Sequence, residues 1–237
     1  MNPRYRSRLV ARQLKAHDRS GASYFAPTPP LEALRTVLSM AATQIGSWVP
    51  ILDPKSSKRM QISFVDIARA YFNARLDQHE HTYVALPPED PDHLTKCARL
   101  LRHMYGTRAA ADGWQEEYSS FLVETLGFAQ GTSSPCVFRH PSRQLVVSVH
   151  GDDFTTARAK DDLDWYEGAV KEKYECTIQP RLGPGEHDGK EAVVLNRIVR
   201  WTHTGIEYEA DPRQAEKPIE ECGLAGGYHR GYSWSTP

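Results

Sequence analysis

The sequence is poor in cysteine and has no long apolar run. Its 237 residues include four cysteines, none of which forms a C-x-x-C pair: Cys97, Cys136, Cys176 and Cys222. This spacing argues against a disulfide framework or a zinc ribbon and favours a reduced, intracellular chain. No apolar stretch approaches the ~18 residues that a membrane span needs, and no signal peptide is visible, so we expect no membrane partner.

The chain also lacks a net charge that would attract nucleic acid over its whole surface. Its 29 basic and 30 acidic residues leave a formal charge of −1. Residues 1–20, however, hold six basic side chains against Asp18 alone, which hints at a polyanionic partner or else marks a solvated N-terminus. Ten histidines include the close pair His79 and His81. No second pair stands at ligand spacing, so we expect no structural zinc.

The spacing of apolar residues predicts a mixed α and β chain without internal repeats. The predicted helices cover residues 31–45, 112–126, 161–174 and 211–222. The predicted strands cover residues 61–66, 81–88, 97–105, 135–139, 144–150, 191–200 and 205–209, and a basic strand or hairpin arm covers residues 5–14. Asp112, with Gln115 three residues later, is the predicted N-cap of the second helix.

Three aspartates stand where apolar, strand-like runs end. Asp66 lies in F-V-D-I-A-R-A-Y-F-N-A, and Asp152 and Asp153 lie in L-V-V-S-V-H-G-D-D-F. Carboxylates at the ends of two adjacent strands can bridge two Mg²⁺ ions ~3.5–4 Å apart, which is what nucleotidyl transfer requires. Without cations, such carboxylates repel one another and raise one another's pKa. The pattern therefore predicts a two-metal nucleotidyl transferase.

A surface hairpin turn is the alternative explanation for the Asp152-Asp153 pair. The chain contains a second pair, Asp161-Asp162, which precedes an amphipathic run and is explained as a helix N-terminus. Asp152 and Asp153 instead follow a strand-like run, and Phe154 resumes the apolar pattern. This difference sets the two pairs apart, but the residues alone leave the surface hairpin turn open beside the catalytic interpretation.

Six sequence blocks stand in a fixed order over residues 5–222. They are Y-R-S-R-L-V-A-R, S-Y-F-A-P-T-P-P with the helix that follows, V-D-I-A-R-A-Y-F-N-A, H-T-Y-V-A-L-P-P, M-Y-G-T-R-A-A-A-D-G-W and V-H-G-D-D-F. In this order they resemble reverse transcriptases of copia-type LTR retrotransposons. The resemblance implies an α+β right-hand polymerase fold: a palm with an antiparallel sheet packed on helices, plus fingers, with the thumb partial or absent. It also implies RNA-directed DNA polymerase activity.

The resemblance implies a domain division and a set of partners. Residues 1–60 would be a fingers-like part, residues 61–204 a palm with an inserted fingers segment at about 81–113, and residues 205–237 the start of a thumb or connection with a loose tail. The expected partners are an RNA or DNA template-primer, dNTPs, and the integrase and RNase H parts of a Pol polyprotein. The expected location is the cytoplasm, in a virus-like particle, and/or the nucleus.

The resemblance also assigns roles to single residues. Asp66, Asp152 and Asp153 would bind two Mg²⁺ ions, with Mn²⁺ as a substitute. Tyr71 matches an aromatic that would clash with a 2′-hydroxyl and so select deoxynucleotides, although without the surrounding block a core aromatic is the favoured interpretation. Ile67, Arg6, Arg8, Arg12 and Arg108 would lie at the nucleotide or template backbone, and His150 and Gly151 near the primer end. Taken singly, the arginines also fit solvated strand residues.

Several positions depart from the family pattern. His150-Gly151 stand for Tyr-Val, Ala74 and Asn196 stand for glycines, and Ala109, Ala111 and Asp112 stand for Gln, Pro and Arg. None of these changes removes a metal ligand. Two hypotheses follow: an active polymerase piece of a retrotransposon polyprotein, or an inactive remnant that keeps the fold and at most binds nucleic acid.

Overall fold

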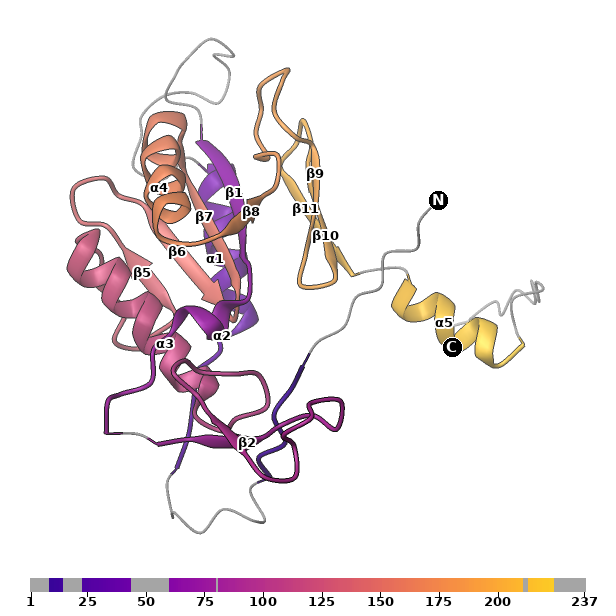
Figure 1. Cartoon of the computed structure of the whole chain (residues 1–237). Coiled ribbons are helices and arrows are strands. Elements are labelled where there is room, and N and C mark those ends of the chain that lie inside the picture. The colour runs from indigo at the N-terminus through magenta and orange to yellow at the C-terminus, as the bar shows by residue number, and fades with distance from the viewer. Residues whose placement is uncertain (1–8, 15–22, 44–59, 80, 211–212, 224–237) are drawn as a thin grey trace.

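A six-stranded antiparallel sheet is the centre of the structure (Figure 1). The computed structural model describes residues 9–14, 23–43, 60–79, 81–210 and 213–223. The sheet order is β4-β5-β6-β7-β1-β8, formed by β1 (Met60–Ile67), β4 (Ala129–Gln130), β5 (Val137–Arg139), β6 (Val146–His150), β7 (Asp153–Ala159) and β8 (Cys176–Ile178). Sequential hairpins build one half of this sheet, while β1 enters from much earlier in the chain to pair with β7 and β8.

Helices cover both faces of the sheet (Figure 1). Helix α1 (Leu31–Thr43) packs on one face; α3 (Ala110–Ser120), its π-helical continuation η2 (Phe121–Thr125) and α4 (Lys160–Lys173) pack on the other. Side chains alternate between faces along a strand. Ile62 and Phe64 of β1 therefore join the core under α1, whereas Val65 and Ile67 join the core under α3 and α4.

Two smaller sheets and two further helices complete the described chain. β2 (Tyr83–Ala85) pairs with β3 (Cys97–Arg99), and β9 (Glu191–Val194), β10 (Arg197–Trp201) and β11 (Ile206–Ala210) form a three-stranded sheet. Ala192, Val194 and Val199 join this sheet to the core under α1. The short helix α2 (Ala70–Asn73) follows β1, and α5 (Arg213–Glu221) follows β11. No helix within the described ranges is long and apolar enough to span a membrane.

The mixed α and β architecture with antiparallel sheets agrees with the predicted fold class, and most predicted elements are present. The predicted apolar stripes are buried: Trp114, Tyr118 and Leu122 on α3 and η2, and Leu163, Tyr166 and Val170 on α4. The division into domains stays a prediction, and residues 44–59, which include the predicted end of the first helix, lie outside the described ranges.

Four local predictions were wrong, the fourth being the single strand at 191–200. Helix α3 begins at Ala110, so Asp112 lies in its first turn, where the side chain accepts a hydrogen bond from the Phe25 N–H at 3.0 Å instead of capping the helix. The strand predicted at 97–105 ends at Arg99, and the described part of the N-terminal arm, residues 9–14, is not a regular strand.

The strand predicted at 191–200 is a hairpin. It turns at Leu195 and Asn196, which both have positive φ values of 50° and 58°. A two-residue turn with both φ values positive matches the twist of its flanking strands, and asparagine tolerates this conformation well. The departure at Asn196 is thus compatible with the turn.

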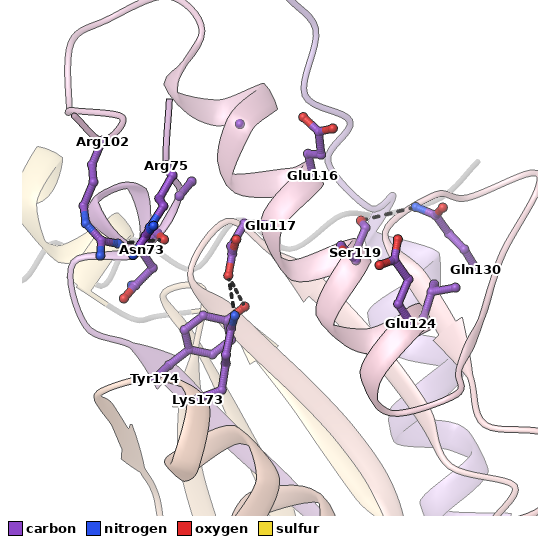
Figure 2. A pocket seen from close by; sticks show the side chains of 14 residues that line it. Asn73, Arg75, Arg102, Glu116, Glu117, Ser119, Glu124, Gln130, Lys173 and Tyr174 are labelled. Atoms are coloured by element: carbon purple, nitrogen blue, oxygen red, sulfur yellow. Dashed lines mark hydrogen bonds and ion pairs between the residues drawn. The ribbon is translucent and has the colours of Figure 1, made fainter. Parts of the chain in front are cut away.

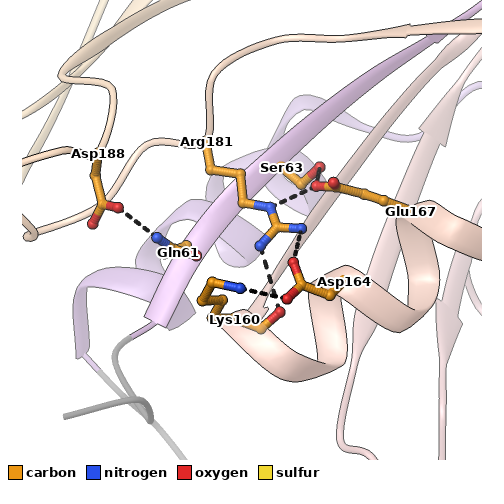
Figure 3. Close-up of polar contacts among 7 residues, drawn as sticks. All are labelled: Gln61, Ser63, Lys160, Asp164, Glu167, Arg181 and Asp188. Carbon is orange, nitrogen blue, oxygen red and sulfur yellow. Dashed lines mark hydrogen bonds and ion pairs between the residues drawn. The ribbon is translucent and has the colours of Figure 1, made fainter.

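A polar network joins β1, α4 and the segment after β8 (Figure 3). Glu167, which is 8% exposed, accepts hydrogen bonds from the Ser63 hydroxyl and from Arg181 Nε, both at 2.7 Å. Arg181 also donates to Asp164 at 2.7 Å, and Lys160 donates to the other oxygen of that carboxylate at 2.6 Å. Glu167 therefore anchors β1 to α4 through Ser63, which lies three residues before Asp66.

We expect Glu167→Ala to lower the free energy of unfolding by about 3 kcal/mol, because it leaves the buried Ser63 hydroxyl without its acceptor and the mostly buried Arg181 guanidinium with Asp164 as its remaining carboxylate partner. The matched control is Lys160→Ala, whose side chain is 61% exposed. This control should cost less than about 1 kcal/mol. Urea denaturation followed by circular dichroism measures both, and equal losses in the two variants would contradict the anchoring role.

Candidate active site

The pairing of β1 with β7 brings Asp66 and Asp153 together. The two residues are directly opposite in the antiparallel register, so their side chains leave the same face of the sheet. That face is the one covered by α1, because Phe64 and Ala157 of the same strands pack there. Asp66 is exposed and Asp153 is half-buried. Asp152, also exposed, lies in the loop next to them, and its carbonyl accepts the Ile67 N–H at 2.9 Å.

A tight turn presents the aspartate doublet. β6 and β7 are joined by Gly151 and Asp152 alone, and Gly151 has φ +63°. A glycine with positive φ at the first position is typical of the two-residue turns that join twisted strands. The Trp114 indole N–H donates to the Gly151 carbonyl at 2.8 Å and so ties the turn to α3. A β-branched side chain at position 151 would be strained in this backbone conformation, so the glycine suits the turn.

The three carboxylates form one negatively charged region. Burial, followed by the charges of Asp152 and Asp66, raises the pKa of Asp153 to about 6. Charge repulsion of this kind is what a cation at the site would relieve. Within the described ranges, however, no three His, Cys, Asp or Glu side chains are positioned to hold an ion as they stand.

A small cavity lies beside Asp153 on the α1 face. Its volume is about 110 Å³. The lining residues on the sheet are Ser148, His150, Asp153 and Thr155, and the remainder come from Pro29 to Leu34 and from Val194 and Leu195. His150 is opposite Asp153 in the β6–β7 register and is half-buried. His150, which departs from the family pattern before the Asp152-Asp153 pair, therefore lines this cavity together with Leu195 of the β9–β10 turn.

Tyr71 lies next to the acidic region, on α2. Burial and the charge of Asp152 raise its pKa. Its ring packs against the ring of Tyr105 with centroids 4.6 Å apart. Arg102 donates from Nη1 to the Phe72 and Asn73 carbonyls at 3.0 and 3.1 Å and so caps the end of this four-residue helix. The tyrosine is thus held on a short, capped helix that directly follows β1.

Tyr105 also links the N-terminal arm to this region. The Ala11 N–H donates to the Tyr105 carbonyl at 2.8 Å, and the Gln13 N–H donates to the Gly106 carbonyl at 3.1 Å. Gly106 has φ +85°, and a Cβ there would lie 1.8 Å from the Ala11 carbonyl oxygen. Only glycine permits this approach.

Two of the predicted basic residues lie in this region, Arg12 on the arm itself and Arg108 in the segment that the arm contacts. Arg12 is exposed between the two hydrogen-bonded residues. The Arg108 N–H donates to the Gln13 side chain at 2.9 Å, and its guanidinium lies 4.8 Å from the Tyr24 ring centroid. Arg6 and Arg8 lie outside the described ranges.

The structure also separates Ile67 from the other predicted residues. Its side chain is 1% exposed and belongs to the core under α3 and α4, while its N–H holds the aspartate loop. Sequence reasoning did not identify Tyr105 or Arg102 as parts of the site, and Trp114 was expected only as a core residue. Their contribution depends on contacts between distant segments, which no local pattern signals.

We expect Asp153→Asn to stabilise the protein at pH 7. The folded protein holds the Asp153 proton up to about pH 6, compared with an ordinary pKa of 3.8. The native state therefore binds more protons than the unfolded chain in this range, and stability falls as the pH rises from about 4 to about 6. The neutral asparagine avoids this loss of stability. The free energy of unfolding should therefore be higher than that of the wild type at pH 7 and equal to it at pH 4.

Urea denaturation at the two pH values measures this effect, with Asp161→Asn as the control. Asp161 lies in the first turn of α4, where a carboxylate favours the helix dipole, so its replacement should give no gain at pH 7. A gain at position 153 that is equally large at pH 4 would contradict the raised pKa of Asp153, which burial and then the charges of Asp152 and Asp66 cause.

Comparison with protein families supports a specific assignment. The family model described as reverse transcriptase (RNA-dependent DNA polymerase) matches residues 1–176. The match spans β1, α2, the N-terminal arm and the whole β6–β7 hairpin, and so includes all three aspartates. A search of curated proteins finds no match. Because the matched segment makes up well over half of the sequence, the chain belongs to the reverse transcriptase (RNA-dependent DNA polymerase) family.

Proposed function

We propose that this chain is the polymerase part of a copia-type retrotransposon polyprotein and extends a primer 3′ end with deoxynucleotides on an RNA template. The observation that carries the proposal is the register of β1 and β7, which sets Asp66 opposite Asp153 next to Asp152. The six-stranded sheet with its helices would be the palm, and β2, β3 and the N-terminal arm would belong to the fingers.

The donor set suits Mg²⁺, because magnesium prefers hard carboxylate oxygens and keeps positions for substrate phosphates. Asp66, Asp152 and Asp153 would hold the ions, and their mutual repulsion, which contributes to the raised pKa of Asp153, favours a bound cation. The carboxylates would turn toward one another on binding. Bound Mg²⁺ supplies activation of the primer hydroxyl and stabilisation of the leaving pyrophosphate.

The remaining residues would position the substrates. The primer 3′-hydroxyl loses its proton to solvent and its oxygen forms a bond to the α-phosphorus, while the bond from that phosphorus to the oxygen that bridges to the β-phosphate breaks and pyrophosphate leaves with that electron pair. Arg12, on the N-terminal arm, and Arg108, which contacts the arm at Gln13, would meet phosphates through charge-assisted hydrogen bonds. The Tyr71 ring, supported by Tyr105, would lie under the sugar of the incoming nucleotide.

We expect the purified protein to extend a DNA primer on a homopolymeric RNA template in the presence of Mg²⁺. Asp66→Asn and Asp152→Asn should each reduce the rate by at least about 100-fold, since each removes a ligand charge from the site. Asp161→Asn is the control, because Asp161 belongs to the first turn of α4, and it should keep the wild-type rate. Binding of Mn²⁺, followed by electron paramagnetic resonance, should weaken in the first two variants only.

The alternative of an inactive remnant predicts a different outcome. Such a protein would bind template-primer duplex but incorporate no nucleotide with either Mg²⁺ or Mn²⁺. That result would sink the polymerase proposal for this chain while leaving its family membership intact.

We expect Tyr71→Ala to admit ribonucleotides. Without the ring, the preference for dNTP over rNTP in kcat/KM should fall by roughly 10-fold to 100-fold, because the clash with the 2′-hydroxyl is lost. Tyr71→Phe keeps the ring and should keep the preference, which separates the ring from the phenolic hydroxyl. Single-nucleotide incorporation with matched dNTP and rNTP substrates measures both variants, and unchanged discrimination in the alanine variant would remove the assigned role.

A further inference from the structure

Two grooves on the surface share a pair of arginines. One groove, of about 900 Å³, lies along α3, and the other, of about 620 Å³, lies along β3 and the segment from Arg75 to Gln78. Arg75 and Arg102 line both, and Figure 2 shows their side chains together at one end of the first groove. Asp66 and Asp153 lie on the face of the sheet covered by α1, whereas the first groove lies over α3 and the end of α4, and none of the three aspartates lines either groove. The grooves are therefore separate from the acidic site.

The shared arginines are held together despite their like charges. Arg75 and Arg102 are directly opposite in an isolated antiparallel bridge, an arrangement that like charges destabilise. Arg99 adds a third guanidinium to the wall of the second groove, against Asp77 as the one acidic lining residue. In the part of the chain that the structure describes, the Arg75 and Arg99 side chains make no hydrogen bond or ion pair. Both are exposed and so available to an anion.

The two grooves differ in the charge of their other residues. Glu116 and Glu124 stand on the α3 and η2 side of the first groove (Figure 2) and would repel an anion there. The second groove instead places Leu76, Leu100 and Leu101 between its arginines, and Leu101 is 75% exposed. A surface with spaced cations and apolar side chains between them suits an unpaired nucleic-acid strand, whose phosphates and base faces are both accessible. A duplex hides its base faces and would leave the leucines uncovered.

We propose that the groove lined by Arg75, Arg99 and Arg102 binds the sugar–phosphate backbone of single-stranded nucleic acid. The inference rests on the proposed function in one respect: the strand would be the unpaired part of the template. Arg102 provides the physical connection, because the same guanidinium that lines the groove also caps α2, the helix that carries Tyr71. A strand in the groove therefore lies one short helix away from the proposed nucleotide site.

The test is the binding of a fluorescein-labelled 15-nucleotide oligo(dT), measured by anisotropy at several salt concentrations. Arg75→Gln combined with Arg99→Gln should raise the Kd on the order of 10-fold and lower the slope of log K against log salt by about 1.4, or ~0.7 per lost phosphate contact on a single strand. Arg75→Lys with Arg99→Lys keeps the charges and should largely restore the slope. The fold should be unaffected, because neither arginine side chain makes a hydrogen bond or ion pair among the described residues, and the substitutions keep the backbone pairing of both residues.

The matched control is Arg143→Gln. Arg143 pairs with Asp162 at 3.0 Å and lines neither groove, so its loss should leave the oligonucleotide affinity unchanged. An Arg75→Gln/Arg99→Gln variant with wild-type affinity and slope would overturn the proposal. Displacement of the labelled oligo(dT) by poly-glutamate, but not by unlabelled oligonucleotide, would also overturn the proposal and would assign the groove to an acidic protein.

A second measurement separates this proposal from the polymerase proposal. With a primer-template that has a 15-nucleotide overhang, the double glutamine variant should bind more weakly than wild type; with a one-nucleotide overhang the two should bind equally. If the wild-type protein extends no primer but the groove variant still loses affinity for oligo(dT), the polymerase proposal fails and the groove stands. If primer extension is normal and the double glutamine variant binds the long overhang as tightly as wild type does, the groove proposal fails while the polymerase proposal stands.

Discussion

The antiparallel pairing of β1 with β7 is the contact on which the rest of the structure depends. It runs from Met60 opposite Ala159 to Asp66 opposite Asp153. The pairing buries Ile62 and Phe154 on opposite faces and leaves the two carboxylates at its end. A slip of one residue would turn every side chain of β1 to the other face and move Asp66 away from Asp153. The apolar core therefore sets the position of the acidic site and offsets the repulsion that gathers there.

The alternation of side chains along this pairing divides the molecule into two working faces. The α1 face carries Asp66, Asp153 and the small cavity that Asp153 lines, and the other face carries the aromatic core with Trp114. The Trp114 indole N–H donates a hydrogen bond to the Gly151 carbonyl in the aspartate turn. Exposed arginines lie outside these two faces, with Arg12 on the N-terminal arm and Arg75 and Arg99 at the groove beside β3. Negative charge at the centre with positive charge around it is the arrangement that a polyanionic substrate and divalent cations would both use.

Local sequence patterns predicted the elements whose buried apolar residues recur at one constant spacing. The stripes of α1, α3 and α4 are long, and their apolar residues recur at helical spacing, so each helix was identified close to its observed bounds. β7 was missed because D-F-T-T-A-R-A contains little apolar surface, and its buried threonines depend on neighbours: the Thr156 hydroxyl donates to the Val146 carbonyl at 2.8 Å. Asp112 was misassigned as a cap for a related reason, since its partner is Phe25, far away in the sequence.

The sequence by itself determined the family and the mixed fold class and predicted the three aspartates as site residues, because these are carried by residue types in a fixed order and by local periodicity. Tertiary structure alone decided that Asp66 meets Asp153, that Tyr105 supports Tyr71 and receives the N-terminal arm, and that Arg75 stands opposite Arg102. These contacts join segments separated by tens of residues. Their geometry follows from strand register and core packing, which are properties of the whole chain and not of any one segment.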